Sequence, residues 1–342
     1  MVLPEHGELG AALQDAGVEV LVRRVGTLRR RLMTLSGIGS IARDAVRDAT
    51  ELRALIRARR IALVHSNTSV VLGGAAAAAA ARVPHVWHVR EIYSRFGRAW
   101  PAYRALLGTA SALPCVSEAT AAQFRTPRAL TIYDGLAVDG HRAAREAARA
   151  TLHLPPDAPV VVVLGRISDW KGQDVLVRAL AQEPLASIGA IGVIAGEAWP
   201  GAEERRDAVL SLARSLGVAD RVMLIGFRED VENVYGAADV VAVPSTEPDP
   251  LPNAALEAAA AGCAVVASAH GGLPEIITEG VTGRLVTPGD ATALARAAAT
   301  LIADPPLRER LGAAAARDVR GRFAPQRMLD AVQALYVQLI TT

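Results

Sequence analysis

The second half of the chain alternates apolar runs with segments whose apolar residues recur at helical spacing. Pro159–Ile167 is a continuous β-branched run, the pattern of a strand buried on both faces. The strands expected in this half are 159–167, 190–197, 221–227, 240–244 and 264–268, and the helices between them are 171–182, 203–216, 231–238 and 253–261. Strict alternation predicts a parallel sheet with helices on both faces. Ligands of such sheets bind at the carboxyl ends of the strands, so the loops 165–172, 244–253 and 268–275 are of most interest.

The first half of the chain is less regular but also predicts an α/β domain. Its expected strands are 18–22, 62–65, 84–89 and 113–116, and its expected helices are 52–59 and 75–82. A charged helix at 142–149 and a Leu-Pro-Pro turn separate the two halves. We therefore expect domains at 1–137 and 138–324, with amphipathic helices at 290–303 and 325–340 after the last strand.

Composition places the chain among soluble globular proteins, with 51% apolar and 21% charged residues. This excludes disordered and collagen-like chains. Two cysteines, Cys115 and Cys263, cannot form a disulfide framework, which favours a reducing cytosol. The longest apolar stretch, Val70–Ala81, has 12 residues, whereas a membrane-spanning helix needs about 20. We expect a cytoplasmic protein, or one that is peripheral to the membrane.

Charge is balanced overall at +2 but divided between the halves. Residues 1–150 contain 21 Arg and 12 acidic residues, a net charge of +9, and residues 151–342 carry −7. A basic half facing an anionic partner and a set of arginine-rich exposed helices both explain this division. The run Arg29-Arg30-Arg31 has the same two readings, a solvated face or contact with an anionic membrane. Aromatic residues are only 4%, so we expect no nucleic-acid partner.

The sharpest local motif is the segment 165–172 (GRISDWKG), which follows a strand and opens a helix. Backbone N–H groups and the positive end of a helix dipole favour an anion at such a position. Arg166 adds a forked donor and Lys171 a point charge. Lys171 is the only lysine in the chain, against 36 arginines. Its alternative role is that of a surface charge at a helix start.

The second motif is a proline-rich loop that enters an alanine-rich helix, at 244–257 (PSTEPDPLPNAALE). Asp249 lies in the loop and Glu257 lies eight residues further on. A carboxylate accepts two hydroxyl hydrogen bonds, which suits a ribose or a sugar diol. The alternatives are that Asp249 caps a turn and that Glu257 pairs with the helix dipole. Taken alone, two carboxylates also fit glycoside hydrolysis or a metal site.

Two further strand ends carry candidate residues. Gly271 and Gly272 follow the strand 264–268 and either let the backbone approach a ligand or support a tight turn. In the first half, the segment 84–91 (PHVWHVRE) brings His88, Arg90 and Glu91 to the end of a strand. His88 is either a ligand contact or a core histidine beside Trp87.

In this order and spacing, the motifs resemble those of the retaining glycosyltransferases of family 4. The resemblance covers most of the chain and rests on the segments 165–172, 249–257, 271–275 (GGLPE) and 282–286 (TGRLV), with weaker matches at 64–67, 116–117 and 133–135. It implies the GT-B fold, in which two Rossmann-like doubly wound domains face each other across a cleft. The segment 325–342 would be a C-terminal helix that returns to the N-terminal domain.

The resemblance also implies a role for each candidate residue. Arg166 and Lys171 would stabilise the departing nucleoside diphosphate, because fixed cations there favour the transition state. Asp249 would contact the transferred sugar, and Glu257 would hold the ribose hydroxyls. The implied catalytic residues are Arg166, Lys171, Asp249, His88, Arg90 and Glu91, and the implied donor contacts are Gly165, Arg166, Lys171, Phe227, Leu251, Asn253 and Glu257.

The implied reaction is a retaining, metal-independent transfer of a sugar from a nucleoside-diphosphate sugar. The donor is a substrate, and no further cofactor is expected. The acceptor is a glycan, a lipid-linked molecule or a small molecule, and the basic first half favours an anionic or membrane-bound one.

The chain departs from the family pattern at several positions. Asp249 stands where a glutamate is usual, and Leu251-Pro252 replaces a Phe-Gly pair, so Pro252 offers no N–H to the sugar. Arg90-Glu91 occupies the place of a His-Asp/Glu pair. The segment 1–7 resembles the end of a second strand, as if a first βα unit of roughly 30–45 residues were missing. The alternatives are therefore a catalytically impaired relative that binds nucleotide without turnover and a sugar-nucleotide epimerase on the same scaffold.

Overall fold

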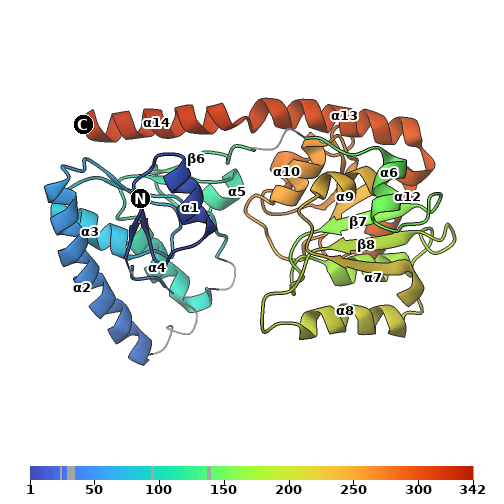
Figure 1. Ribbon diagram of the computed structural model, residues 1–342, viewed down its shortest axis with the longest axis horizontal. Coiled ribbons are helices and arrows are strands. Elements are labelled where there is room, and N and C mark those ends of the chain that lie inside the picture. Colours follow the sequence, from blue (N-terminus) through green and yellow to red (C-terminus); the bar gives the residue numbers. More distant parts are fainter. Residues whose placement is uncertain (24, 29–34, 94–95, 137–139, 342) are drawn as a thin grey trace. The chain divides into compact units, whose positions relative to one another are not determined.

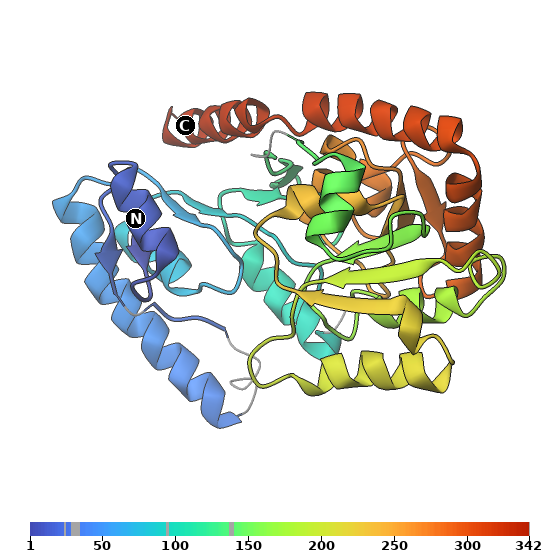
Figure 2. The same ribbon diagram turned by 45° about the vertical axis from the view of Figure 1, so that its right-hand side comes forward.

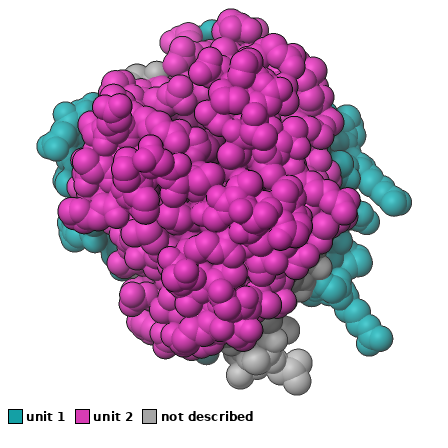
Figure 3. All heavy atoms as spheres, turned by 90° about the vertical axis from the view of Figure 1, so that its right-hand side faces the viewer, with its two compact units in different colours: residues 1–132, 330–342 teal, residues 133–329 magenta. Residues whose placement is uncertain are grey.

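The computed structural model describes residues 1–23, 25–28, 35–93, 96–136 and 140–341 and divides the chain into two compact units (Figure 3). Unit 1 comprises residues 1–132 together with 330–342, and unit 2 comprises residues 133–329. The boundary expected between 137 and 138 and the arginine run at 29–31 lie outside the described residues.

Unit 2 is built on a six-stranded parallel sheet with the strand order β12-β11-β10-β7-β8-β9. Its strands are β7 (Val160–Leu164), β8 (Ile191–Ala195), β9 (Val222–Gly226), β10 (Val240–Val243), β11 (Val265–Ser268) and β12 (Arg284–Val286). The order runs outward from β7 in one direction and from β10 in the other, which is the doubly wound arrangement. The place where the two directions meet, between β7 and β10, is where such sheets bind ligands.

Helices cover both faces of this sheet (Figures 1 and 2). They are α6 (Arg145–Thr151), α7 (Gln173–Leu180), α8 (Glu204–Ser215), α9 (Val231–Ala237), α10 (Asn253–Ala260), α11 (Leu273–Ile276), α12 (Ala291–Ala303) and α13 (Pro305–Arg322). Successive residues of β7 point to opposite faces, so Val161 packs with the α7, α8 and α12 side and Val160 with the α6 and α9 side. The continuous apolar run at 159–167 is therefore explained by burial on both faces.

Unit 1 consists of short parallel strand pairs with helices. Its strands are β1 (Val2–Leu3), β2 (Leu21–Val22), β3 (Val64–Ser66), β4 (His85–Trp87), β5 (Leu113–Cys115) and β6 (Ala129–Thr131). Its helices are α1 (Glu8–Asp15), α2 (Leu35–Ala58), α3 (Gly73–Ala81), α4 (Trp100–Leu107) and α5 (Glu118–Ala121). Strands pair as β1-β2, β3-β4 and β5-β6, and single parallel bridges link β4 to the β5 region. The greater part of α14 (Pro325–Thr341) belongs to this unit.

The five strands expected in the second half are present, shortened by at most three residues at either end. The sequence did not predict helices α1, α4, α5, α11 and α13. Helix α13 begins with two prolines and has charged residues on both sides of its uncharged middle, which hid it, although Asp304 caps it by accepting the N–H of Leu307 at 2.9 Å. Helix α2 begins at Leu35 rather than at residue 52, because Gly37 and Gly39 disguise its first turns.

Candidate functional site

The loops that follow β7 and β10 start from neighbouring strands at the carboxyl edge of the unit 2 sheet. Their approach depends on glycines that have no room for a side chain. At Gly172, which has φ +78°, a Cβ would lie 2.0 Å from the carbonyl oxygen of Pro244. At Gly271, which has φ +59°, a Cβ would lie 2.4 Å from the carbonyl oxygen of Asp249. The glycine pair at 271–272 therefore seats the Asp249 loop through backbone contact.

Lys171 and Asp249 meet across these loops in an ion pair, with Nζ 2.6 Å from Oδ2. The side chain of Lys171 is 25% exposed and that of Asp249 is 8% exposed. The Lys171 ammonium also lies 4.4 Å from the ring centroid of Trp170, within cation–π range. Two segments 78 residues apart in the sequence are thus joined at the strand ends, as the topology requires.

Arg166 is exposed at the start of the same loop, and its guanidinium carbon lies 4.1 Å from the centre of the Trp199 ring. Trp199 lies in the loop after β8, at the same edge of the sheet, and is itself largely exposed. Sequence reasoning missed Trp199. It is one of only four tryptophans and follows a predicted strand end, which was the available signal.

Glu257 lies on α10, and its Oε2 accepts a hydrogen bond from the hydroxyl of Tyr235 on α9 at 2.9 Å. Burial raises the pKa of Glu257, and the Tyr235 hydrogen bond partly offsets this increase. Tyr235 was also missed from the sequence. Its contact orients the carboxylate and leaves Oε1 to accept another donor.

The other predicted donor contacts line the same edge with different exposure. Phe227 follows β9 directly and is 69% exposed. Asn253 is the first residue of α10 and is exposed, whereas Leu251 is buried in the preceding loop. A Cβ added at Gly165 would meet nothing within 4 Å, so the loop after β7 is open there.

The predicted residues of unit 1 lie together after β4. Arg90 Nε donates to the side-chain oxygen of Asn67 at 3.4 Å. Glu91 accepts hydrogen bonds from the hydroxyls of Thr68 and Ser69, which hold its carboxylate within the unit. His88 is buried, and its Nε2 has no hydrogen-bond partner within the described part of the chain.

Burial, reinforced by the charge of Arg90, lowers the pKa of His88 to about 3. The imidazole is therefore neutral at pH 7. The structure places His88, Arg90 and Glu91 near one another after β4.

A cavity of about 500 Å³ lies between α7 and α8, and Ile167, Ser168 and Asp169 of the loop after β7 form part of its lining. Neither Lys171, Asp249 nor Glu257 lines it. Across residues 1–23, 25–28, 35–93, 96–136 and 140–341, no group of three or more His, Cys, Asp or Glu side chains is arranged to hold a metal ion. None of the helices described is both long and apolar enough to span a membrane.

Two family models match the chain. Residues 144–318 match the model described as glycosyl transferases group 1, and residues 7–132 match the one described as glycosyltransferase family 4. The chain is 43% identical over 145 residues to D-inositol 3-phosphate glycosyltransferase of Mycolicibacterium smegmatis, which covers 42% of this chain and 32% of that protein. It is 34% identical over 194 residues to the lipopolysaccharide core biosynthesis glycosyltransferase LpsE of Rhizobium meliloti. This match covers 57% of this chain and 53% of LpsE. The matches span about a third to a half of the curated relatives' length.

Solved structures match over nearly the whole chain. Anabaena HepE in complex with UDP is 25% identical with a TM-score of 0.83, covering 98% of this chain and 91% of that chain. HepE in complex with UDP-glucose gives a TM-score of 0.80 at the same identity, covering 97% and 91%.

Proposed function

Because the chain belongs to the glycosyl transferases group 1 family, we propose that it transfers a sugar from a nucleoside-diphosphate sugar to an acceptor. The observation that carries the proposal is the contact between Lys171 and Asp249 at the meeting point of β7 and β10. The HepE complexes with UDP and UDP-glucose support a donor of this class.

Lys171 and Arg166 are the groups that stabilise the departing diphosphate. Negative charge grows on the phosphate as the bond to the sugar breaks, so fixed cations favour the transition state over the ground state. An ammonium has three donors, and Asp249 engages one of them, so Lys171 is held in place and can still donate to a phosphate oxygen. Arg166, stacked on Trp199, presents a planar fork that matches a phosphate.

The remaining donor contacts follow from the same edge of the sheet. Glu257 accepts the ribose hydroxyls through the oxygen that Tyr235 leaves available. The exposed ring of Phe227 offers an apolar face to the nucleobase. Asp249 contacts the transferred sugar, and its shorter side chain and the adjacent Pro252 select a sugar different from the one that a Glu and a Phe-Gly pair would accept.

The transfer retains the anomeric configuration and requires no metal ion, because the cations of the C-terminal unit neutralise the diphosphate. A leaving-phosphate oxygen takes the proton of the acceptor hydroxyl, so no protein carboxylate has to act as the base. His88, Arg90 and Glu91 bind on the acceptor side, and the +9 charge of residues 1–150 favours an anionic acceptor.

The test is turnover of a panel of nucleoside-diphosphate sugars, UDP-glucose among them, by the wild type and by Lys171 variants. Nucleotide release measures the rate, and NMR of the anomeric proton of the product gives its configuration. Lys171→Ala should lower kcat by about 10²–10³-fold, the effect of removing one transition-state donor. The matched control is Arg296→Ala, which removes an exposed cation from α12 of the same unit and should leave kcat unchanged. Lys171→Arg keeps the charge and should restore only part of the rate, because its fork does not fit the single-point contact with Asp249.

Several outcomes would count against the proposal. Full activity of Lys171→Ala would remove this residue from the site, and inhibition by a chelator would refute metal independence. An inverted anomer would refute retention. Saturable UDP binding with no turnover of any nucleoside-diphosphate sugar would support the impaired relative instead.

A further inference from the structure

A second cavity of unit 2, of about 360 Å³, lies at the edge of the sheet opposite the proposed donor site. Its lining comes from the amino-terminal ends of β10 and β11, the segment before α6 and the first turn of α13. The charged residues that line it are Arg142, Arg145, Asp239, Arg308 and Glu309. Strand β10 (Val240–Val243) separates this cavity from the loop that carries Asp249.

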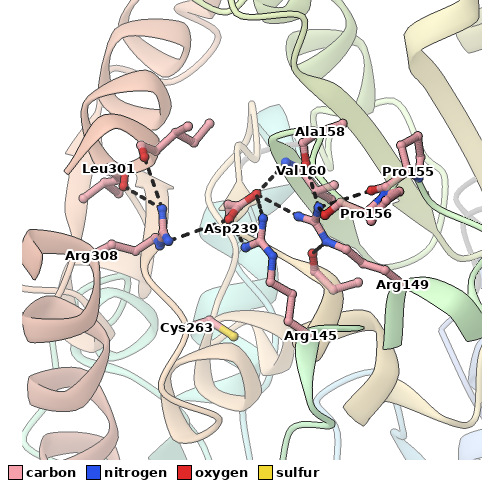
Figure 4. Close-up of polar contacts among 12 residues, drawn as sticks. Arg145, Arg149, Pro155, Pro156, Ala158, Val160, Asp239, Cys263, Leu301 and Arg308 are labelled. Atoms are coloured by element: carbon pink, nitrogen blue, oxygen red, sulfur yellow. Dashed lines mark hydrogen bonds and ion pairs between the residues drawn. The ribbon is translucent and has the colours of Figure 1, made fainter. Parts of the chain in front are cut away.

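Asp239 is the centre of the cluster and is almost fully buried (Figure 4). Its Oδ2 accepts hydrogen bonds from Arg149 Nη2 at 2.9 Å and from the backbone N–H of Val160 at 2.8 Å. Arg145 donates to Oδ1 through Nη1 and to Oδ2 through Nη2 at 3.4 Å, and Arg308 Nη2 lies 3.8 Å from Oδ1. One carboxylate is therefore the ion-pair partner of three guanidinium groups.

The three arginines differ in how many of their N–H donors bind acceptors of the protein. Arg149 is buried, and its remaining donors bind backbone carbonyl oxygens, those of Ala237, Pro155, Pro156 and Ala158. Arg149 and Asp239 thus form a closed pair inside the unit. Arg308 donates through Nη1 to two carbonyls at the end of α12, but its Nη2 reaches Asp239 only at 3.8 Å.

Charge in and behind the cavity is unbalanced. The lining has three arginines against two carboxylates, an excess of one positive charge, and behind it the charge of Arg149 is offset by Asp157. Among the described residues, Glu309 forms no ion pair within 4.0 Å that would neutralise an arginine of the lining. Partly buried guanidiniums that share one carboxylate keep an unmatched charge, and this favours binding of a further anion.

We propose that this cavity binds a phosphate group, as free phosphate or as a phosphomonoester. Guanidinium forks match the tetrahedral oxygens of phosphate and bind them more strongly than neutral donors do. The volume is in the range of small-molecule sites, and the lining is polar, as a charged ligand requires. The site is separate from the proposed donor site, because none of Lys171, Asp249 and Glu257 lines it.

The test is calorimetric titration of the full chain with inorganic phosphate, against sodium chloride at equal ionic strength. We expect saturable binding in the millimolar range or tighter, weakened about tenfold or more by Arg308→Gln and by Arg142→Gln. Arg142→Gln is the second variant because Arg142 is exposed and does not donate to α12. Arg310→Gln, two residues further along α13 and outside the cavity, is the matched control and should bind as the wild type does.

Lys171→Ala separates this inference from the proposed function. It should lower turnover of the sugar donor and leave the phosphate affinity of this cavity unchanged. Phosphate binding that is lost in Lys171→Ala but kept in both arginine variants would place the ion in the donor site and overturn the proposal. Absence of saturable binding to the wild type would also overturn it.

A second arm distinguishes the source of the phosphate. Flotation with phosphatidic acid vesicles, with phosphatidylcholine vesicles as the blank, reports binding to a lipid phosphomonoester. Vesicle binding that is weakened by Arg308→Gln and displaced by inorganic phosphate would identify a headgroup as the ligand. A calorimetric signal without vesicle binding would identify a soluble phosphate.

Discussion

Replacing Asp239 by Asn removes one negative charge from the interior of unit 2 while conserving the volume of the side chain. The carboxylate accepts hydrogen bonds from Arg149 and from the backbone N–H of Val160 through one oxygen and from Arg145 through both oxygens. An amide has a single acceptor oxygen, so its NH₂ group must face a donor on one side. The guanidinium of Arg149, with a side chain only 2% exposed, then loses its counter-ion.

The expected loss of stability follows from that exposure. Breaking a buried ion pair by removing one partner costs about 3–5 kcal/mol, because the remaining charge stays desolvated. This is a large part of the roughly 5–15 kcal/mol by which a domain is stable. The matched control is Asp318→Asn on α13, which breaks a pair with Arg322 whose side chains are 32% and 36% exposed. An exposed helical pair of this kind contributes about 0.3–0.5 kcal/mol.

Urea unfolding followed by tryptophan fluorescence measures the difference, since Trp170 and Trp199 lie in unit 2. The chain has two units, so hydrogen exchange of the β7 and β10 amides should accompany it and show which unit opens. We expect Asp239→Asn to lower the transition midpoint and the protection of these strands far more than Asp318→Asn does. Equal effects of the two substitutions would refute the closed pair between Asp239 and Arg149.

Two further predictions concern unit 1 and the donor loops. Burial lowers the pKa values of His65 and His85 to about 4 and that of His88 to about 3, against 6.5 for an exposed histidine. The folded state therefore binds fewer protons, so the stability contribution is fully present above pH 6.5. It falls below pH 6.5, down to about pH 4 for His65 and His85 and about pH 3 for His88, by up to about 1.4 kcal/mol per pH unit for each histidine. Urea midpoints at a series of pH values measure this slope, and an unchanged slope in His88→Gln would contradict it. Gly271→Ala would bring a Cβ to 2.4 Å from the carbonyl oxygen of Asp249, so the Asp249 loop must shift and turnover should fall by at least tenfold. Circular dichroism without added UDP should show that the variant still folds at low temperature. Normal kinetics would show that Gly271 does not hold the loop in place.

The fold was largely predictable because strand burial leaves a strong sequence pattern. The residues of β7 are apolar on both faces of the sheet, and the parallel α/β architecture follows from such strands alternating with helices. The GT-B class, which the solved structures confirm, was implied by the resemblance of the motifs to a known family. Helix α13 was missed because small residues, Gly312, Ala315 and Ala316, make up much of its buried face. The glycines near the start of α2 hid a helix that packing against α3 stabilises.

The candidate site was predictable only as far as topology determines it. Strand order brings the loops after β7 and β10 together, so the proximity of Lys171 and Asp249 follows from the alternation of elements. Trp199 and Tyr235 could not be assigned in this way, because their contacts depend on side-chain direction across two elements. Asp239 was missed because it lies at the amino end of its strand, whereas ligands of parallel sheets are expected at the carboxyl ends.

The ion pair at the carboxyl edge explains why a chain with 36 arginines has a lysine at position 171. Gly172 lies against the backbone of Pro244, and Thr246 donates its N–H to the carbonyl of Trp170 at 2.8 Å, so the backbone on both sides of Lys171 is fixed. From that fixed backbone the ammonium reaches one carboxylate oxygen of Asp249. A guanidinium is planar and wider, and pairing through both of its arms with the nearly buried Asp249 would turn its donors away from the loop. Under the proposed function, a compact cation with three rotatable donors would hold the carboxylate and a phosphate oxygen together, and we propose this double contact as the reason for a lysine at position 171.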